Sequence, residues 1–229
     1  MSSSTLQLSS FPEELLEGIL AHCVIASSTQ TPRPSWTRTL GSRSSTSSSI
    51  RSRLAILLVC KKFYRISIPL YYHTIHVQSP LQLNRLLGTA LRPNPATALH
   101  IRRVIFAGIW ADGGELLRMA GDSIRLLDVS IDITQLAPNV PGQVRDLDAE
   151  EFCEGLKELS SLKHLVLRKP NNVYLTQPKP RYFLSAVAKA MCGWNELVCV
   201  SSFGFPSSSR PHHFSLYLVG ICRAGFPAV

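Results

Sequence analysis

Apolar residues recur at helical spacing near the start of the chain. Positions three or four apart form one apolar stripe made of Leu15, Leu16, Ile19, Leu20, Cys23 and Val24. Ser10 and Glu13 form a capping-box pair just before the stripe, and Pro12 between them suits a first helical turn. The pattern predicts an amphipathic helix that begins near residue 11.

A polar segment separates this helix from a second helical pattern. Of the 26 residues at 27–52, seventeen are Ser, Thr or Pro, four are Arg and none is acidic. Such a segment buries too little apolar surface to offset its ordering entropy, so we expect a disordered loop. The helical pattern resumes at Arg53, and its apolar positions are Leu54, Leu57, Leu58, Val59, Phe63 and Ile66. We expect Pro69 to limit this helix.

From residue 74 onward, short apolar runs alternate with helical patterns. Strands are predicted at 74–77, 101–107, 124–131, 162–167 and 196–201. Helices are predicted at 79–91, 115–120, 148–159 and 181–191, with Ser79 and Asp148 as N-caps. Strands that alternate with helices indicate a parallel sheet.

Four of the predicted strands share an apolar-x-x-apolar-x-apolar frame. The frame begins at Ile101, Ile124, Leu162 and Trp194, at separations of 23, 38 and 32 residues. Leucine-rich repeats use this frame to lay one short strand per repeat along a concave face. The irregular period predicts degenerate repeats at most. Candidate side chains on the concave face are Arg103, Ile105, Arg125, Asp128, Lys163 and Val166.

Two blocks of the N-terminal third resemble the F-box family. Residues 11–20, FPEELLEGIL, resemble its opening, usually written L-P-x-E-[LI]-[LI]-x-x-I-[LF], with Phe11 in place of Leu. Residues 57–64, LLVCKKFY, followed by PLYY at 69–72, resemble its second half. The resemblance covers roughly residues 9–77. The two halves are nearly contiguous in the family, whereas here the Ser/Arg-rich segment separates them.

This resemblance implies a substrate-recognition adaptor of an SCF-type ubiquitin ligase. The first helices would dock a Skp-type adaptor of the cullin-based ligase, and the repeat-like region would bind an unknown protein substrate. The docking residues would be Phe11, Pro12, Leu15, Leu16, Ile19, Leu20, Leu58, Val59, Cys60 and Phe63. Substrate would contact Arg103, Arg125, Asp128 and Lys163. The alternative is that the apolar docking residues form only the core of a helical hairpin.

Charge leaves a second class of function open. The net charge is +9, and all of it belongs to residues 1–111, which carry twelve Lys or Arg and three acids. A basic half can bind nucleic acid or chromatin through phosphate contacts. However, only Trp36 supplies an aromatic side chain in the basic loop. We keep as alternatives a nucleic-acid- or chromatin-associated protein and an F-box-like interaction protein without a ligase role.

No pattern predicts catalysis, a cofactor or a metal site. Gly121-Asp122-Ser123 resembles a hydrolase nucleophile block, but no His follows an Asp by three residues. His73-x-x-His76 and His212-His213 lack nearby carboxylate or Cys ligands, and the six cysteines lack zinc spacing. We therefore expect reduced thiols and no enzyme activity.

The N-terminus lacks a signal-peptide pattern, and no apolar run reaches the ~18 residues of a membrane helix. We expect an intracellular protein, cytoplasmic or nuclear, with no membrane partner.

These patterns divide the chain into four parts. Residues 1–8 would be disordered, 9–73 would form the helical F-box-like domain, 74–206 the repeat-like domain, and 207–229 an irregular, frayed tail. The expected fold is α+β overall: an N-terminal helical F-box followed by an α/β leucine-rich-repeat-like solenoid of parallel strands.

Overall fold

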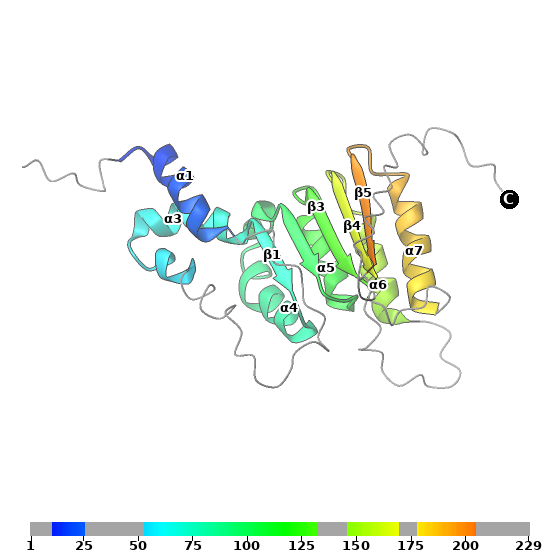
Figure 1. Cartoon of the computed structure of the whole chain (residues 1–229). Coiled ribbons are helices and arrows are strands. Elements are labelled where there is room, and N and C mark those ends of the chain that lie inside the picture. The colour runs from blue at the N-terminus through cyan, green and yellow to red at the C-terminus, as the bar shows by residue number, and fades with distance from the viewer. Residues whose placement is uncertain (1–10, 26–52, 132–145, 170–177, 205–229) are drawn as a thin grey trace, which may run out of the picture.

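The computed structural model describes residues 11–25, 53–131, 146–169 and 178–204. Helices at residues 11–25 and 53–73, here called the helical unit, lie at one end of the molecule (Figure 1). The remaining described residues, here called the sheet unit, combine a five-stranded parallel sheet with helices. The fold is therefore mixed α and β. The predicted loop at 27–52, the termini at 1–8 and 207–229, and Cys222 fall outside the described residues.

The helical unit contains two helices of equal length joined through a shorter helical turn. Helix α1 spans Glu13–Val24 and helix α3 spans Lys61–Tyr72, with a helical turn at 53–57. Pro12 is the N-cap of α1 and no side chain caps the helix, so the expected capping by Ser10 and Glu13 is wrong. Glu13 is instead the first helical residue, where its charge favours the helix dipole.

The prediction of a single helix that begins at Arg53 is wrong. The chain leaves helical geometry at residues 58–60, and α3 begins at Lys61. Pro69 does not end α3, which continues to Tyr72. Proline lacks the N–H that would bond to the residue four positions earlier, but the helix tolerates this loss within its final turn. A small core of Leu16, Leu20, Val24 and Leu70 holds the unit together.

The five strands follow chain order across the sheet, β1-β2-β3-β4-β5, and every neighbouring pair is parallel. The strands are β1 Thr74–Val77, β2 Arg103–Phe106, β3 Leu126–Ser130, β4 His164–Lys169 and β5 Cys199–Gly204. The sequence pattern located each strand, and the bounds of β1 are as predicted. The other four begin two or three residues later than predicted. The later start of these strands decides which residues alternate between the two faces of the sheet.

Helices connect successive strands and lie on one face of the sheet (Figure 1). They are α4 Pro80–Leu86, which continues as the π-helix η3 Leu87–Leu91, the 3-10 helix η4 Pro95–His100, α5 Ala111–Ala120, α6 Leu147–Leu156 and α7 Pro178–Met191. Ser79 caps α4 as predicted, with its Oγ accepting from Gln82 N. Helix α6 is capped by Asp146, which corrects the predicted cap at Asp148.

One continuous apolar core lies between the sheet and its helices. Alternate strand residues such as Val104, Leu127 and Leu165 meet helix residues such as Leu83 and Leu116. Aromatic rings extend this core: Phe106, Phe152 and Phe183 pack edge to face in series, with centroid separations of 5.1 and 6.0 Å. The other face of the sheet has no such helical cover among the described elements.

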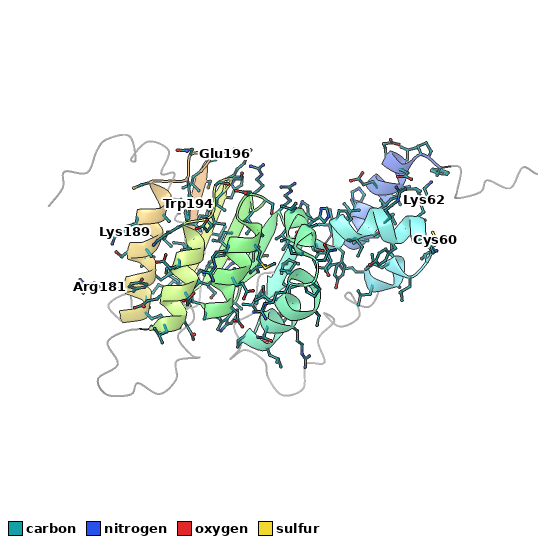
Figure 2. All side chains as sticks on the ribbon, turned by 180° about the vertical axis from the view of Figure 1, so that it is seen from behind. Cys60, Lys62, Arg181, Lys189, Trp194 and Glu196 are labelled. Carbon is teal, nitrogen blue, oxygen red and sulfur yellow. The ribbon has the colours of Figure 1, made fainter. Side chains whose placement is uncertain are left out.

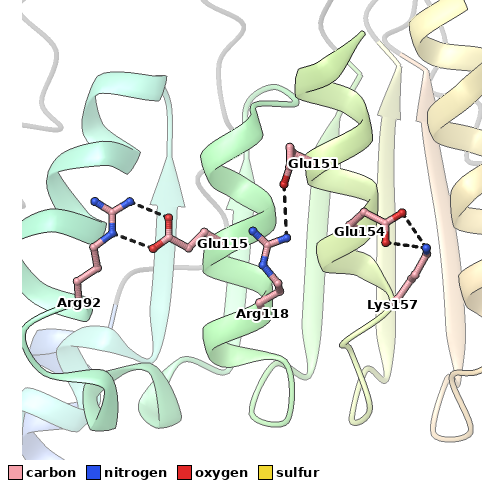
Figure 3. A network of polar contacts seen from close by, with 6 residues as sticks. All are labelled: Arg92, Glu115, Arg118, Glu151, Glu154 and Lys157. Carbon is pink, nitrogen blue, oxygen red and sulfur yellow. Dashed lines mark hydrogen bonds and ion pairs between the residues drawn. The ribbon is translucent and has the colours of Figure 1, made fainter. Parts of the chain in front are cut away.

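Helices α5 and α6 approach so closely that only glycine fits between them. A Cβ at Gly114 would lie 2.0 Å from the carbonyl oxygen of Glu151, and one at Gly155 would lie 2.5 Å from that of Gly114. Outside this contact, ion pairs cross the outer face of the helical layer (Figure 3). Arg92 binds Glu115 at 2.7 Å, and Arg118 reaches Glu151 at 3.7 Å.

A repeated backbone pattern marks where each strand begins. The carbonyl oxygens of His73, Arg102, Arg125 and Lys163 each accept two successive N–H groups from the next strand, at 2.8–3.1 Å. Side chains repeat as well: Arg102 donates to Ser123 O at 3.2 Å, and Arg125 donates to Ser161 O at 3.3 Å. Equivalent residues in successive strands therefore make equivalent contacts.

Candidate interaction surfaces

Large apolar side chains are exposed on the helical unit. Leu58 is 85% exposed, Val59 61%, Leu15 56% and Ile19 55%. Leu15 and Ile19 lie four positions apart on α1 and so share one face of the helix. Pro12, Cys60 and Leu54 are also exposed. We call these residues the apolar docking surface.

The ten predicted docking residues divide into two groups. Leu16 and Leu20 are buried in the core of the helical unit, and Phe11 and Phe63 pack against that core. The other six are exposed: Pro12, Leu15, Ile19, Leu58, Val59 and Cys60. Four of the ten residues therefore belong to the core of the helical unit, as the alternative expected. The other six have exposed side chains.

Hydrogen bonds and ion pairs hold the two halves of the docking surface at one end of the unit. Lys62 Nζ donates to Phe11 O at 2.9 Å, and Arg65 pairs with Glu13. The start of α3 therefore lies beside the start of α1, which brings the 58–60 turn close to Pro12. Figure 2 shows Cys60 and Lys62 on the part of the helical unit that is remote from the sheet.

The opposite ends of the same helices are joined by Arg53. Its guanidinium donates to the carbonyl oxygens of Val24 and Tyr71 and lies 5.0 Å from the centre of the Tyr71 ring. Burial lowers the pKa of Arg53 from its ordinary value, although the nearby Tyr71 opposes this shift. Arg53 is thus committed to internal contacts.

Side chains on the face of the sheet that carries no described helix form a second candidate surface, here called the open face, on which Thr74, Ile105, Asp128 and Ser130 are buried. Its positions alternate with the core positions along each strand. The described side chains on it are Thr74, His76, Arg103, Ile105, Leu126, Asp128, Ser130, His164, Val166, Arg168, Cys199 and Ser201. Two of the four predicted substrate contacts, Arg103 and Asp128, lie on this face.

A charged cluster crosses the open face from β1 to β4. Asp128 is only 1% exposed and accepts two hydrogen bonds from Arg168, at 2.7 and 2.6 Å. Arg103 lies on the neighbouring strand, two positions before the partner of Asp128. His76 lies on β1, opposite Ile105. The buried Nε of Arg103 and the buried Nε2 of His76 have no hydrogen-bond partner among the described residues.

Two of the predicted substrate contacts, Arg125 and Lys163, do not lie on the open face. Arg125 and Lys163 lie just before β3 and β4, at the edge where the strands begin. Both approach Glu196, at 2.7 Å from Arg125 and 3.7 Å from Lys163. The sequence frame begins two residues before the strand, so side chains at these positions do not follow the alternation of the sheet.

Burial, and then nearby positive charge, shifts the pKa values of His76 and His73 at the junction of the two units. The pKa of His76 is lowered, first by burial and then by Arg103 and Arg53, although Asp128 opposes the shift. The pKa of His73 is lowered by burial, Arg102 and Arg103. Burial also lowers the pKa of Arg103, while Asp128 raises it and Arg168 lowers it.

Other features that could carry chemistry do not form a site. The five cysteines among the described residues are free, and the pKa of the buried Cys153 is raised to about 12, chiefly by burial, which leaves it a protonated thiol. Cys23, Cys60 and Cys192 are exposed. No cluster of three or more His, Cys, Asp or Glu in the described ranges could hold a metal ion. None of the described helices is long and apolar enough to cross a bilayer.

A shallow groove of about 290 Å³ lies between α6 and α7. Its lining combines Cys153, Tyr182, Lys157 and Lys189. Lys157 is bonded to Glu154 at 2.7 Å. The groove lies in the helical layer, on the opposite side of the sheet from the open face.

Most of the basic residues that favoured nucleic acid cannot be placed on a common surface of the described structure. Arg33, Arg38, Arg43 and Arg51 fall outside the described residues. Arg53 and Arg102 are engaged by backbone carbonyl groups within the molecule.

Comparison with models of known protein families, with curated proteins and with solved structures found no match to this chain.

Proposed function

We propose that this chain is a substrate-recognition adaptor of an SCF-type ubiquitin ligase. The helical unit, as an F-box, would dock a Skp-type adaptor through the apolar docking surface. The sheet unit, as a short solenoid of degenerate leucine-rich repeats, would bind a protein substrate on its open face. The observation that carries the proposal is the exposure of Leu15, Ile19, Leu58 and Val59 at positions where the sequence resembles the F-box.

The energetics of exposure support docking by this surface. Each large aliphatic side chain contributes about 1.5–3 kcal/mol when it is fully buried. The helical unit leaves four such side chains more than half exposed while it keeps a core of only four buried residues. Contiguous apolar patches on proteins commonly mark sites of protein association. A partner with an apolar helical surface would recover this burial.

The regularity of the sheet unit supports its role as a repeat array. Strand order follows chain order, and the paired backbone bonds at the strand starts recur from β1 to β5. Repeat arrays of this kind present an extended surface on which side chains of successive strands meet a partner. The open face combines charged residues with the partly exposed aliphatic residues Leu126 and Val166.

The junction between the units supports a role in positioning. Only His73 separates α3 from β1, and its carbonyl oxygen accepts from the N–H groups of Arg102 and Arg103, at 3.0 Å each. A substrate on the open face would therefore be held at a set orientation to the docked ligase. An adaptor contributes proximity and no bond-making step of its own. We accordingly propose a non-enzymatic, cofactor-free protein that acts in the cytoplasm or nucleus.

Co-purification with a Skp-type adaptor tests the proposal. We expect the full chain to retain the adaptor, and Ile19→Asp and Leu58→Asp each to abolish the association. Both side chains are exposed, so the substitutions leave the core intact. Leu16 is unsuited to the test because it is buried and a charge there would damage the helical unit itself.

Leu81→Asp is a matched control. Leu81 is 62% exposed, but it lies on α4 of the sheet unit. We expect this variant to retain the adaptor. Equal retention by the wild type and both docking variants, or no retention by any of them, contradicts the proposed function.

A further inference from the structure

We infer that the outer edge of β5 binds residues 217–221 of the same chain as a sixth parallel strand. The inference concerns the sheet unit alone and does not depend on the ligase role. It is carried by a repeated backbone contact that stops at β5, by apolar side chains beside this edge, and by an apolar frame in the chain beyond β5.

The two ends of the sheet differ. At the β1 end, His73 alone separates the strand from α3 of the helical unit. At the other end, β5 is paired with β4 and with no further strand among the described residues, and α7 is the last helix (Figure 1). An edge strand leaves one side of its backbone unpaired and can pair with another strand. The sheet can therefore extend beyond β5 in the order of the chain.

The repeated contact at the strand starts stops at β5. The residue that donates the first N–H to one strand supplies the carbonyl acceptor for the next, in a series made of Arg102, Arg125 and Lys163. Val198 continues this series, because its N–H donates to Lys163 O at 2.9 Å. The carbonyl oxygen of Val198 accepts no backbone N–H from the described residues. It is therefore the acceptor that a sixth strand would use.

Apolar side chains lie beside this edge. Val198 is 55% exposed at the start of β5. Leu184 and Met191 lie seven positions apart on α7 and so share one side of the helix. Both are only partly buried against the core, and neither lines the groove between α6 and α7. They therefore lie on the side of α7 that faces away from α6, where a sixth strand would complete their burial.

The chain beyond β5 contains a matching segment. Residues 216–221 repeat the apolar-x-x-apolar-x-apolar frame, with apolar residues Leu216, Val219 and Ile221. In β2, β3 and β4, the two N–H donors directly follow the first apolar residue of the frame. The same rule makes Tyr217 and Leu218 the donors to Val198 O. The second and third apolar residues of the frame would then face the core, because alternate strand residues face opposite sides.

The connection is long enough for a parallel strand. Residues 205–216 join the end of β5 to Tyr217, and parallel neighbours need a crossover of about a dozen residues. Strand β5 has six residues and so spans about 20 Å, whereas a dozen extended residues reach about 40 Å. The connection can therefore return along the sheet. A second apolar frame begins at Phe214 but leaves a shorter connection, so we place the strand at 217–221.

A segment tethered so closely has an advantage over other partners. A short flexible connection gives an effective concentration in the millimolar range, which a second copy does not reach in dilute solution. The inference differs from the expected frayed tail, because the unpaired acceptor of Val198 becomes visible only in the folded sheet.

Oxidation of the full chain carrying Leu218→Cys tests the strand and its register. Arg103 is paired with Leu126 in the sheet, and the equivalent pair at the new edge is Cys199 with position 218. Neighbouring strands lie about 4.8 Å apart, which is within the Cα separations that a disulfide spans. We expect peptide mapping to find a disulfide between Cys199 and the introduced thiol.

Val219→Cys is the matched control, because its side chain would face the opposite side of the sheet from Cys199. We expect it to form roughly tenfold less of the disulfide with Cys199. The inference is overturned if the two variants form this disulfide equally or if neither forms it. A disulfide that joins two chains also overturns it, because a second copy would then occupy the edge.

Hydrogen exchange of the unsubstituted chain provides a second measurement. We expect the amides of Leu218 and Gly220, which would face β5, to exchange at least about tenfold more slowly than in a free peptide. Leu218→Pro removes the N–H that would donate to Val198 O, and should speed exchange both at 217–221 and in β5. Ser208→Pro, in the connection, should leave both unchanged. Exchange at the free-peptide rate in the unsubstituted chain, or equal effects of the two proline variants, contradicts the inference.

Discussion

The helical unit and the sheet unit distribute their apolar side chains in opposite ways. In the sheet unit, strands and helices bury one continuous core that includes Phe106, Phe152 and Leu127. In the helical unit, four buried residues form the core while Leu15, Ile19, Leu58 and Val59 stay exposed. The sheet unit thus buries most of its apolar side chains in one core, although Leu81, Leu99, Leu147 and Val198 are exposed on its surface. The helical unit leaves a larger share of its apolar side chains exposed. We expect mutations in the core of the sheet unit to affect stability, and mutations of the exposed residues of the helical unit to affect association.

The largest effect is expected in the core of the sheet unit. Phe152 is fully buried between Phe106 and Phe183. Phe152→Ala removes an aromatic side chain and leaves a cavity, which should lower the free energy of unfolding by about 3–5 kcal/mol. Urea denaturation followed by circular dichroism measures the change. A loss below about 1 kcal/mol would show that the core is not packed as described.

The contact between α5 and α6 should give the next largest effect. Gly114→Ala forces a methyl group against the Glu151 carbonyl and must separate the helices, at a cost of roughly 2–3 kcal/mol. Gly18→Ala is the matched control on α1, where nothing lies within 4 Å of the new Cβ. There alanine should stabilise the helix by up to ~1 kcal/mol. Urea denaturation measures the free energy of unfolding of both variants. A change of the same sign in Gly114→Ala and Gly18→Ala would contradict the close approach of α5 and α6.

Substitutions on the docking surface should barely alter stability. Leu58 is largely exposed in the turn before α3, so Leu58→Asp should change the free energy of unfolding by no more than about 0.5 kcal/mol. Thermal denaturation of the isolated chain provides the measurement. A large loss would mean that Leu58 belongs to the core of the unit, and the comparison between the two units would then fail.

The smallest expected effect is a change in titration at the junction of the two units. His76 should titrate by NMR below the ordinary value of 6.5, because burial and the positive charges of Arg103 and Arg53 lower its pKa. Arg103→Gln should raise this pKa, and Asp128→Asn should lower it further. Because the folded pKa lies below the unfolded one, the unfolded chain binds a proton at His76 more readily, and the folded state loses stability as pH falls through about 6.5. If Arg103→Gln lowered the pKa of His76, or Asp128→Asn raised it, Arg103 and Asp128 would not lie beside His76 as described.

Sequence patterns located most elements because apolar periodicity reports burial directly. Each strand was found from its apolar run, and β1 was placed with its observed bounds. Caps and breaks were harder to place. Pro69 sits inside α3, and Asp146 rather than Asp148 caps α6. Several polar residues at a helix start compete for the same N–H groups, so spacing alone does not select the cap.

The candidate surfaces were only partly predictable for a related reason. An apolar residue in a motif can face its own core or a partner, and only the tertiary packing separates Leu16 from Leu15. On the sheet, the start of each strand decides which residues alternate across its faces. Arg103 falls inside β2, whereas Arg125 falls just before β3 and turns to Glu196. The pairing of Asp128 with Arg168, 40 residues apart, leaves no signal in local spacing.

The order of the strands has a mechanical consequence. Among the described strands, each is hydrogen-bonded to the strands that precede and follow it along the chain, and no pairing joins strands distant in sequence. A force that pulls on β5 would break the hydrogen bonds between one pair of neighbouring strands at a time, because each strand contacts mainly its nearest neighbours. The sheet should therefore peel strand by strand under load, with β4 and β5 separating while the pairing of β1 with β2 still holds.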